Sequence, residues 1–385
     1  MIVAIVVAAM LMVPAIVFMV ECLFGLICLQ SAPVGDAPPF AVLMPAHDEA
    51  RGIQATIGAV VGQLRPGDRL LLVADNCADD TARLARDAGA EVAERSDPAR
   101  RGKGYALAFG RAALEADLPP VVIVMDADCR AAPGSLTTLA AEAFERNAAV
   151  QGLYLFDSES RSAPLVAISN FAFLVKNMIR QRGLARMGAP ALLQGTGMAF
   201  PRAIFASAPL AGDDIVEDLS LGITLLRQGH DVRWTETSRF TSFAASQAAT
   251  VSQRKRWEHG FLSSAVTGFP KLLVAAVKRR HLALVLIALD LLVPPLSLFV
   301  TVLILAWSGF AVLAVVTGAF APLLIVSAAL AFVVAGVLLA WAAEGRRALP
   351  FRTLLKAPFY MIWKAPIYGS LFLRKQKDWV RTARD

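Results

Sequence analysis

Cysteine is scarce in this sequence, and no two cysteines are spaced to share a metal ion. The 385 residues include four cysteines. Cys22 and Cys28 lie in an apolar N-terminal stretch, whereas Cys77 and Cys129 lie in the more polar middle of the chain. Because C-x-x-C pairs are absent, neither a zinc site nor a disulfide framework is indicated. We therefore expect a reduced protein whose polar part faces the cytosol.

Two familiar nucleotide-binding motifs are missing as well. The sequence has no G-x-G-x-x-G after its first expected strand, which argues against a nucleotide-dependent oxidoreductase. The segment around Lys103, Arg-Gly-Lys-Gly, lacks the G-x-x-x-x-G-K-[ST] spacing of a P-loop. The sequence therefore contains neither of these two motifs.

Charge is also limited, and it is unevenly placed. Charged residues make up 18% of the chain, and the net charge is +7. Residues 346–385 hold ten Lys/Arg against two acids, interleaved with aromatic residues such as Trp363. Basic and aromatic residues in this mixture are typical of segments on an anionic membrane surface. We therefore expect membrane lipids, and not nucleic acid, as the partner of this segment.

Apolar runs are what the sequence has in excess, since 56% of its residues are hydrophobic. Residues 1–29 are almost wholly apolar apart from Glu21, and the run is long enough to span a bilayer. It lacks the basic start of a signal peptide, so we expect a retained transmembrane anchor over 1–30. Residues 282–343 have room for two transmembrane helices, with a turn near 307–310 or 317–322.

Basic residues lie on both sides of the second apolar block: Lys271, Lys278, Arg279 and Arg280 precede it, and Arg346, Arg347, Arg352 and Lys356 follow it. Positive flanks mark the cytoplasmic side, so this block crosses an even number of times. We therefore expect a multi-pass protein of the inner membrane with a cytoplasmic domain over 38–256. An amphipathic interface helix over 257–280 and a basic aromatic interfacial segment with a cytoplasmic tail over 346–385 complete the expected layout.

Strand and helix patterns alternate from residue 40 onward. Expected strands cover 39–47, 69–76 and 91–95, and a fourth begins at Val121; expected helices cover 53–64, 78–89 and 104–116. Such an alternation predicts an α/β fold with a mainly parallel, doubly wound sheet. After Gln151 the pattern loosens into longer helices and short strands.

Two aspartates follow the fourth expected strand, in the sequence VVIVMDADC of residues 121–129. Alternate side chains of a strand share a face, so Asp126 and Asp128 are expected to point the same way. Paired carboxylates suit Mg²⁺ or Mn²⁺, and the carboxyl edge of an open α/β sheet is where ligands bind. The alternative is an acidic turn that caps the next helix.

Asp75 and Lys103 carry similar alternatives. Asp75 ends the second expected strand, where it is either a ligand-binding acid or part of a helix cap. Lys103 lies between two glycines at the start of a helix, where it could bind a phosphate. A solvated basic turn is the other interpretation.

Two later segments also carry candidate chemistry. Glu217 and Asp218 begin an apolar-periodic helix, where the macrodipole favours acids in any case; the functional hypothesis makes Asp218 a general base. The segment Gln253–Trp257 is either a basic membrane-proximal helix or a place where Trp257 stacks on a sugar or base beside a bound diphosphate.

Taken in order, these motifs resemble the family 2 glycosyltransferases with the GT-A fold, in the membrane-anchored branch around cellulose, hyaluronan and poly-N-acetylglucosamine synthases. The resemblance covers roughly residues 40–260. It is carried by PAHDE at 45–49, Asp75, the glycines around Lys103, Asp126-Ala-Asp128, Gln194-Gly-Thr-Gly197, Glu217-Asp218, Gln253-x-x-Arg256-Trp257 and the tail WVRTAR at 379–384.

The resemblance implies a role for each motif. The nucleotide-sugar site would consist of Pro45, His47, Glu49, Asp75, Lys103, Asp126, Gln253, Arg256 and Trp257, with Asp75 contacting a uracil. The acceptor site would consist of Gly195, Thr196, Gly197, Glu217 and Trp257. Asp126 and Asp128 would hold Mn²⁺ or Mg²⁺, and Asp218 would be the catalytic base.

The implied activity is a metal-dependent, inverting transfer from a nucleotide sugar, with a UDP-sugar as the expected donor. Polymerising synthases of this branch have more transmembrane helices than the three expected here. We therefore expect the addition of one or a few sugars to a lipid-linked or saccharide acceptor, in envelope glycan, exopolysaccharide or glycolipid synthesis. The alternatives are a processive synthase that works with polysaccharide-export subunits, and a degenerate scaffold subunit without activity.

Overall fold

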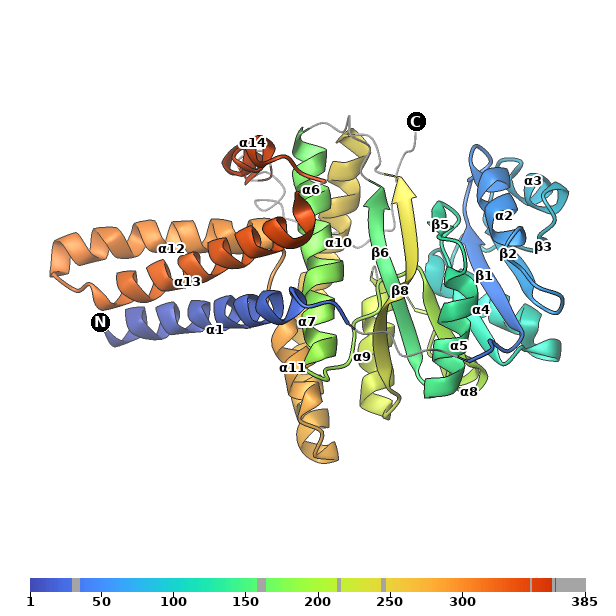
Figure 1. Ribbon diagram of the computed structural model, residues 1–385, viewed down its shortest axis with the longest axis horizontal. Coiled ribbons are helices and arrows are strands. Elements are labelled where there is room, and N and C mark those ends of the chain that lie inside the picture. Colours follow the sequence, from blue (N-terminus) through green and yellow to red (C-terminus); the bar gives the residue numbers. More distant parts are fainter. Residues whose placement is uncertain are drawn as a thin grey trace. The chain divides into compact units, whose positions relative to one another are not determined.

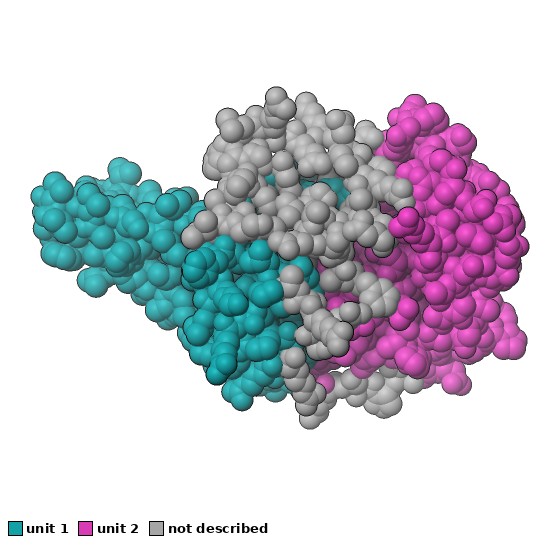
Figure 2. Space-filling view, turned by 90° about the horizontal axis from the view of Figure 1, so that it is seen from above, with its two compact units in different colours: residues 1–28, 158–189, 246–376 teal, residues 29–157, 190–245, 377–385 magenta. Residues whose placement is uncertain are grey.

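A computed structural model describes residues 1–29, 35–157, 164–212, 216–243, 247–346, 348–361 and 364. The chain divides into two compact units (Figure 2). The first comprises residues 1–28, 158–189 and 246–376, and the second comprises residues 29–157, 190–245 and 377–385. Each unit is therefore assembled from segments that lie far apart in the sequence.

The second unit is built on an eight-stranded sheet with the order β3-β2-β1-β4-β7-β6-β8-β5 (Figure 1). Its strands are β1 (Phe40–Ala46), β2 (Arg69–Asp75), β3 (Glu91–Arg95), β4 (Val121–Val124), β5 (Cys129–Ala131), β6 (Ala149–Asp157), β7 (Met198–Pro201) and β8 (Val232–Phe243). Strands β3, β2, β1 and β4 are parallel, as the alternating pattern predicts. Strand β7 is antiparallel to both β4 and β6, β6 is parallel to β8, and β5 is antiparallel to β8. The expected α/β fold is confirmed, with an antiparallel insertion.

Helices connect and cover these strands. They are α2 (Ile53–Val61), α3 (Thr81–Asp87), α4 (Lys103–Leu114), a 3-10 turn (Glu115–Asp117), α5 (Ser135–Arg146), α8 (Arg202–Ser207) and α9 (Glu217–Gln228). Helix α4 packs against β1, β2 and β3, and α5 packs against β4, β6, β7 and β8. All of β4 and nearly all of β1 and β2 are buried, as expected for parallel strands covered on both faces.

The first unit is helical. It contains α1 (Ile2–Gly25), α6 (Pro164–Leu174), a π-helix (Val175–Arg180), α7 (Gln181–Arg186), α10 (Gln247–Arg279), α11 (Ala283–Asp290), α12 (Leu296–Thr317), α13 (Ala321–Ala340), a second π-helix (Trp341–Gly345) and α14 (Phe351–Leu354). Helices α1 and α12 both pack against α13 (Figure 1). The turn between α12 and α13 falls at 318–320, within the second of the two expected positions.

In the part of the chain that the structure describes, four helices are long and apolar enough to cross a membrane: Ile2–Gly25, Arg256–Arg279, Leu296–Thr317 and Ala321–Gly345. The second of them coincides with the segment expected as an interface helix, and its mean hydropathy of 1.5 is lower than the 2.5 to 2.9 of the others. Length and composition thus permit one more span than the three expected. The interfacial position of 257–280 and the boundaries of the membrane segments stay predictions. Most of the basic segment at 346–385, with the WVRTAR tail, lies outside the described residues.

The lone acid of the N-terminal apolar run has a charged partner. The Arg180 guanidinium lies between Glu21 and Asp290, and all three side chains are buried. Buried ionisable groups in apolar helices are costly unless they are paired. This ion-pair cluster therefore joins α1, the first π-helix and the end of α11 within the first unit.

Candidate active site

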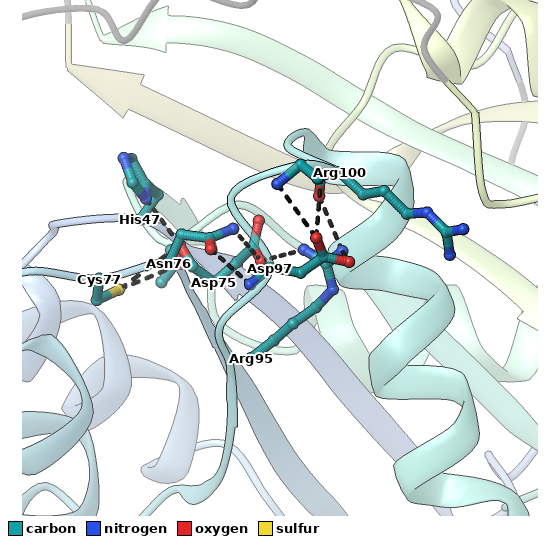
Figure 3. Close-up of polar contacts among 9 residues, drawn as sticks. His47, Asp75, Asn76, Cys77, Arg95, Asp97 and Arg100 are labelled. Carbon is teal, nitrogen blue, oxygen red and sulfur yellow. Dashed lines mark hydrogen bonds and ion pairs between the residues drawn. The ribbon is translucent and has the colours of Figure 1, made fainter.

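The carboxyl ends of β1 and β2, beside the end of β3, hold the first group of predicted residues (Figure 3). Asp75 is the last residue of β2 and is 7% exposed. Its Oδ1 accepts a hydrogen bond from Arg95 at 2.6 Å and another from the Asn76 side chain at 2.9 Å. Among the described residues, both hydrogen bonds to this carboxylate go to Oδ1. Oδ2 is therefore the oxygen that could accept a hydrogen bond from a ligand.

Arg95 was not singled out from the sequence, yet it organises this edge. It ends β3 and donates to the Asp97 carboxylate at 3.1 Å and to the Arg100 carbonyl at 2.8 Å. The Asn76 side chain accepts from the Asp97 N–H at 2.7 Å. One guanidinium therefore balances the charge of Asp75 and fixes the loop that leads to Lys103. The sequence did contain a signal for this role: Arg95 ends the strand that follows the one ending at Asp75.

The end of β1 is tied to the end of β2. Pro45 lies within β1, and the His47 ring donates from Nδ1 to the Asp75 carbonyl at 2.7 Å. The Glu49 N–H donates to the Thr81 hydroxyl at 2.7 Å. Because β1 and β2 are parallel neighbours, these contacts bring the predicted nucleotide residues Pro45, His47, Glu49 and Asp75 to one edge of the sheet.

The paired aspartates come together by a route different from the predicted one. Strand β4 ends at Val124, and Asp126–Asp128 form a turn closed by the Cys129 N–H to the Asp126 carbonyl at 3.1 Å. The expectation that strand alternation aligns them is wrong, because the chain must turn at once to start β5. The turn nonetheless places carboxylate oxygens of Asp126 and Asp128 within 4.8 Å of each other and of the Cys129 sulfur.

This donor set fits a hard divalent cation. Two carboxylates are the ligands that Mn²⁺ and Mg²⁺ prefer. Cys129 is buried, and burial together with Asp128 and Asp126 raises the pKa of its thiol well above the usual value. The thiolate is the form that binds metal, so the two carboxylates, and not the Cys129 thiol, are the hard donors of this cluster.

Lys103 is the cation of the cluster. It is the first residue of α4, follows Gly102 at φ 132°, and forms an ion pair with Asp126. Its ammonium also donates to the Gly195 carbonyl at 2.6 Å. Burial alone would lower the pKa of Lys103, but Asp126, Glu217 and Asp218 raise it above its ordinary value. Lys103 therefore stays charged at any physiological pH.

Glu217 and Asp218 begin α9, as predicted, and their surroundings differ. Burial and the neighbouring Asp218 raise the pKa of Glu217 to about 7, against the opposing effect of Lys103. Asp218 directs Oδ2 toward Gly195, where an added Cβ would lie 3.2 Å from that oxygen. The aspartate predicted as the base therefore borders the segment predicted to contact the acceptor.

The segment Gln194–Gly197 joins these parts. Gly195 and Gly197 have φ values of 92° and 64°, in the left-handed region that glycine adopts most readily. Between them Thr196 is buried, and its hydroxyl accepts from the Asp126 N–H at 3.1 Å. The structure thus brings Lys103, Asp126, Asp128, Glu217, Asp218 and the Gly195–Gly197 segment together. The carboxylates of Asp126, Asp128 and Asp218 outnumber the single ammonium of Lys103, and this excess of acidic groups favours a divalent cation.

Gly197→Ala is expected to destabilise the second unit strongly. A Cβ there would lie 2.3 Å from the Phe240 ring and would force a left-handed φ on alanine. Together these effects cost about 2–5 kcal/mol. Thermal unfolding should show a clearly lower midpoint, whereas Gly58→Ala, in a helix where a Cβ meets no described atom within 4 Å, should leave it unchanged or slightly higher. An equal midpoint for both variants would contradict the assigned packing.

The Gln253–Trp257 segment lies on α10, in the first unit. The Gln253 side chain is outside the described residues. The Trp257 ring stacks on Phe173 with 5.8 Å between centroids. The predicted roles of Gln253, Arg256 and Trp257 in binding the nucleotide or acceptor therefore stay predictions.

Known proteins share this sequence pattern and fold. Residues 38–260 match the family described as "Glycosyltransferase like family 2". The probable glycosyltransferase YdaM of Bacillus subtilis (strain 168) is 26% identical over 239 residues, which are 58% of this chain and 56% of YdaM. The chain therefore spans little more than half the length of this curated relative.

Among solved structures, the mannosyltransferase PcManGT from Pyrobaculum calidifontis, in complex with GDP-Man and Mn²⁺, has a TM-score of 0.56 at 17% identity. The match covers 97% of this chain and 99% of PcManGT. The fold and the family expected from the motifs are confirmed: the chain belongs to glycosyltransferase-like family 2 and has the GT-A fold.

Proposed function

We propose that this protein is a metal-dependent, inverting glycosyltransferase that uses a nucleotide sugar as donor. The observation that carries the proposal is the joint placement of Asp126, Asp128, Lys103 and Asp218 around Gly195. Membership of the family supplies the reaction class. The arrangement supplies one cation, a pair of hard metal ligands and a separate carboxylate for proton transfer.

The proposed nucleotide pocket lies at the ends of β1 and β2. Asp75 Oδ2 would accept a hydrogen bond from the base, as the resemblance implies for a uracil. Arg95 holds the aspartate in place through Oδ1. PcManGT was solved with GDP-Man, so both UDP- and GDP-sugars belong in any test of the donor.

In the proposed reaction Asp218 accepts the proton of an acceptor hydroxyl as that hydroxyl attacks the anomeric carbon. The carbon–oxygen bond to the diphosphate breaks in the same displacement, so no sugar is bonded to the protein. Asp126 and Asp128 would hold Mn²⁺ or Mg²⁺, which neutralises the charge on the departing diphosphate. Lys103, and by resemblance Arg256, would stabilise the same charge.

The proposed acceptor is a lipid-linked or saccharide molecule at the inner membrane face, with the catalytic unit in the cytoplasm. Among the described residues, four helices that are apolar enough to span a membrane support this setting. Addition of one or a few sugars is the preferred mode, and a processive synthase with export subunits is the alternative. A long polymer made by the purified chain alone would decide for the alternative.

A panel of nucleotide sugars tests the donor proposal on detergent-purified, full-length protein. With Mn²⁺ present, we expect one class, UDP- or GDP-linked, to raise the thermal midpoint, because a ligand of the folded state stabilises it. Without divalent metal the shift should largely disappear. Equal midpoints for all nucleotides, with and without Mn²⁺, would contradict a nucleotide-sugar site.

A further inference from the structure

Gln151 is a buried amide in the middle of the sheet, and no motif of the sequence singles it out. It lies on β6 and is 0% exposed. Its Oε1 accepts from the Gln194 N–H at 2.8 Å, and its Nε2 donates to the carbonyls of Thr196 at 2.9 Å and Gly152 at 2.7 Å. If the amide were flipped, its NH₂ group would face the Gln194 N–H, and its oxygen would face the carbonyls of Thr196 and Gly152. The backbone partners therefore fix the orientation of the amide.

Gln151 lies where the ladder between β6 and β7 ends. The β6–β7 ladder pairs Val150 with Ala199 and Gln151 with Met198. Upstream of Met198 the chain leaves the ladder through two glycines with left-handed φ. The Gly152 N–H of β6 still donates to the Gly197 carbonyl at 2.8 Å, and the Gln151 side chain adds hydrogen bonds to the Gln194 and Thr196 backbone of the departing segment.

The opposite side of that segment meets the candidate active site. The Thr196 hydroxyl accepts from the Asp126 N–H, the Gly195 carbonyl accepts from Lys103, and Gly195 lies against Asp218. One buried amide therefore holds a four-residue segment that contacts a predicted metal ligand, the cation and the predicted base.

We propose that Gln151 is a positioning residue of the glycosyl transfer reaction: it holds the Gln194–Gly197 segment and, through Thr196, the Asp126 end of the metal site. The inference rests on the proposed function. It adds that the metal site depends on a side chain that contacts neither metal nor substrate. Partners of this kind typically contribute about 10- to 100-fold in metal affinity or activity.

The test compares Gln151→Met with wild type in the full-length protein. Methionine keeps the length of the side chain and removes its hydrogen bonds to the backbone. Mn²⁺ affinity, measured by electron paramagnetic resonance without nucleotide, should fall about 10-fold, and kcat should fall about 10- to 100-fold. Thr235→Val is the matched control: Thr235 lies on β8, the strand next to β6, and the substitution removes its buried hydrogen bond to Glu142 of α5. It should lower the unfolding midpoint and leave Mn²⁺ affinity and kcat unchanged.

A second pair of variants tests the same route if Gln151→Met does not fold. Thr196→Val removes the hydroxyl that holds the Asp126 N–H and should weaken Mn²⁺ binding, whereas Thr196→Ser should restore it. When Gln151→Met does fold, the double variant Gln151→Met/Thr196→Val should lose less than the product of the single losses, because both sites act through one segment.

The inference is overturned if Gln151→Met binds Mn²⁺ and turns over like wild type, or if Thr235→Val loses as much. A folded wild type that neither binds Mn²⁺ nor turns over any nucleotide sugar would instead remove the proposed function itself.

Discussion

Asp218→Asn is expected to lower kcat by about 100- to 10,000-fold, the usual contribution of a general base. Asparagine keeps the size and shape of the side chain at the start of α9 but cannot accept the proton of the acceptor hydroxyl. Nucleotide binding should change little, because Asp75 and the paired aspartates are untouched. Turnover and a nucleotide titration on the same preparation measure the two effects separately.

Asp231→Asn is the control for that variant. Asp231 has a half-exposed side chain paired with Arg233 in the same unit, and its loss should leave turnover unchanged. Turnover of Asp218→Asn within a few-fold of wild type would remove Asp218 from the role of base. The neighbouring Glu217, with its raised pKa, would then be the next carboxylate to test.

Removal of the divalent metal should have an effect of similar size. Stabilisation of a departing diphosphate by a metal ion is worth several kcal/mol, so EDTA should lower turnover by roughly 100-fold or more. Asp126→Asn should do the same in the presence of Mn²⁺, because it removes a ligand and leaves Lys103 without its carboxylate. Turnover measured over a range of Mn²⁺ concentrations distinguishes weakened binding from lost activity.

The metal experiment has two controls. Added Mn²⁺ or Mg²⁺ should restore the EDTA-treated wild type, and Asp117→Asn, at a side chain that is 89% exposed, should behave as wild type. Unchanged turnover in EDTA would contradict the metal assignment at Asp126 and Asp128.

The parallel half of the sheet could be predicted from the sequence because its signals are local. Strands β1, β2 and β4 are continuous apolar runs, and two of them lead directly into an acid or an acidic turn. The carboxyl ends of parallel strands lie at the same edge of a sheet, so Asp75 and Asp126 are expected at one edge. The turn that joins Asp126 to Asp128 was only the alternative interpretation of the sequence, since an apolar run does not mark the residue at which its strand ends.

The rest of the site depends on contacts between distant segments. Strand β7 lies between β4 and β6 and is antiparallel to both, and no local sequence pattern predicts this pairing. Gln151 binds a segment more than forty residues away, and Arg95 reaches Asp75 from the neighbouring strand. In the first unit, Glu21 was visible as an interruption of an apolar run, but its partner Arg180 was not. From a single sequence one can see that such a residue is polar, but not which distant residue it contacts.

The central claim is that this chain turns over a nucleotide sugar at the site around Asp126 and Asp218. The most direct measurement is the release of nucleoside diphosphate from a panel of UDP- and GDP-sugars by purified full-length protein, with lipid extract as acceptor. We predict metal-dependent release from one donor class, increased by the lipid extract and lost in Asp218→Asn. No release from any donor, or equal release by wild type and Asp218→Asn, would contradict the claim.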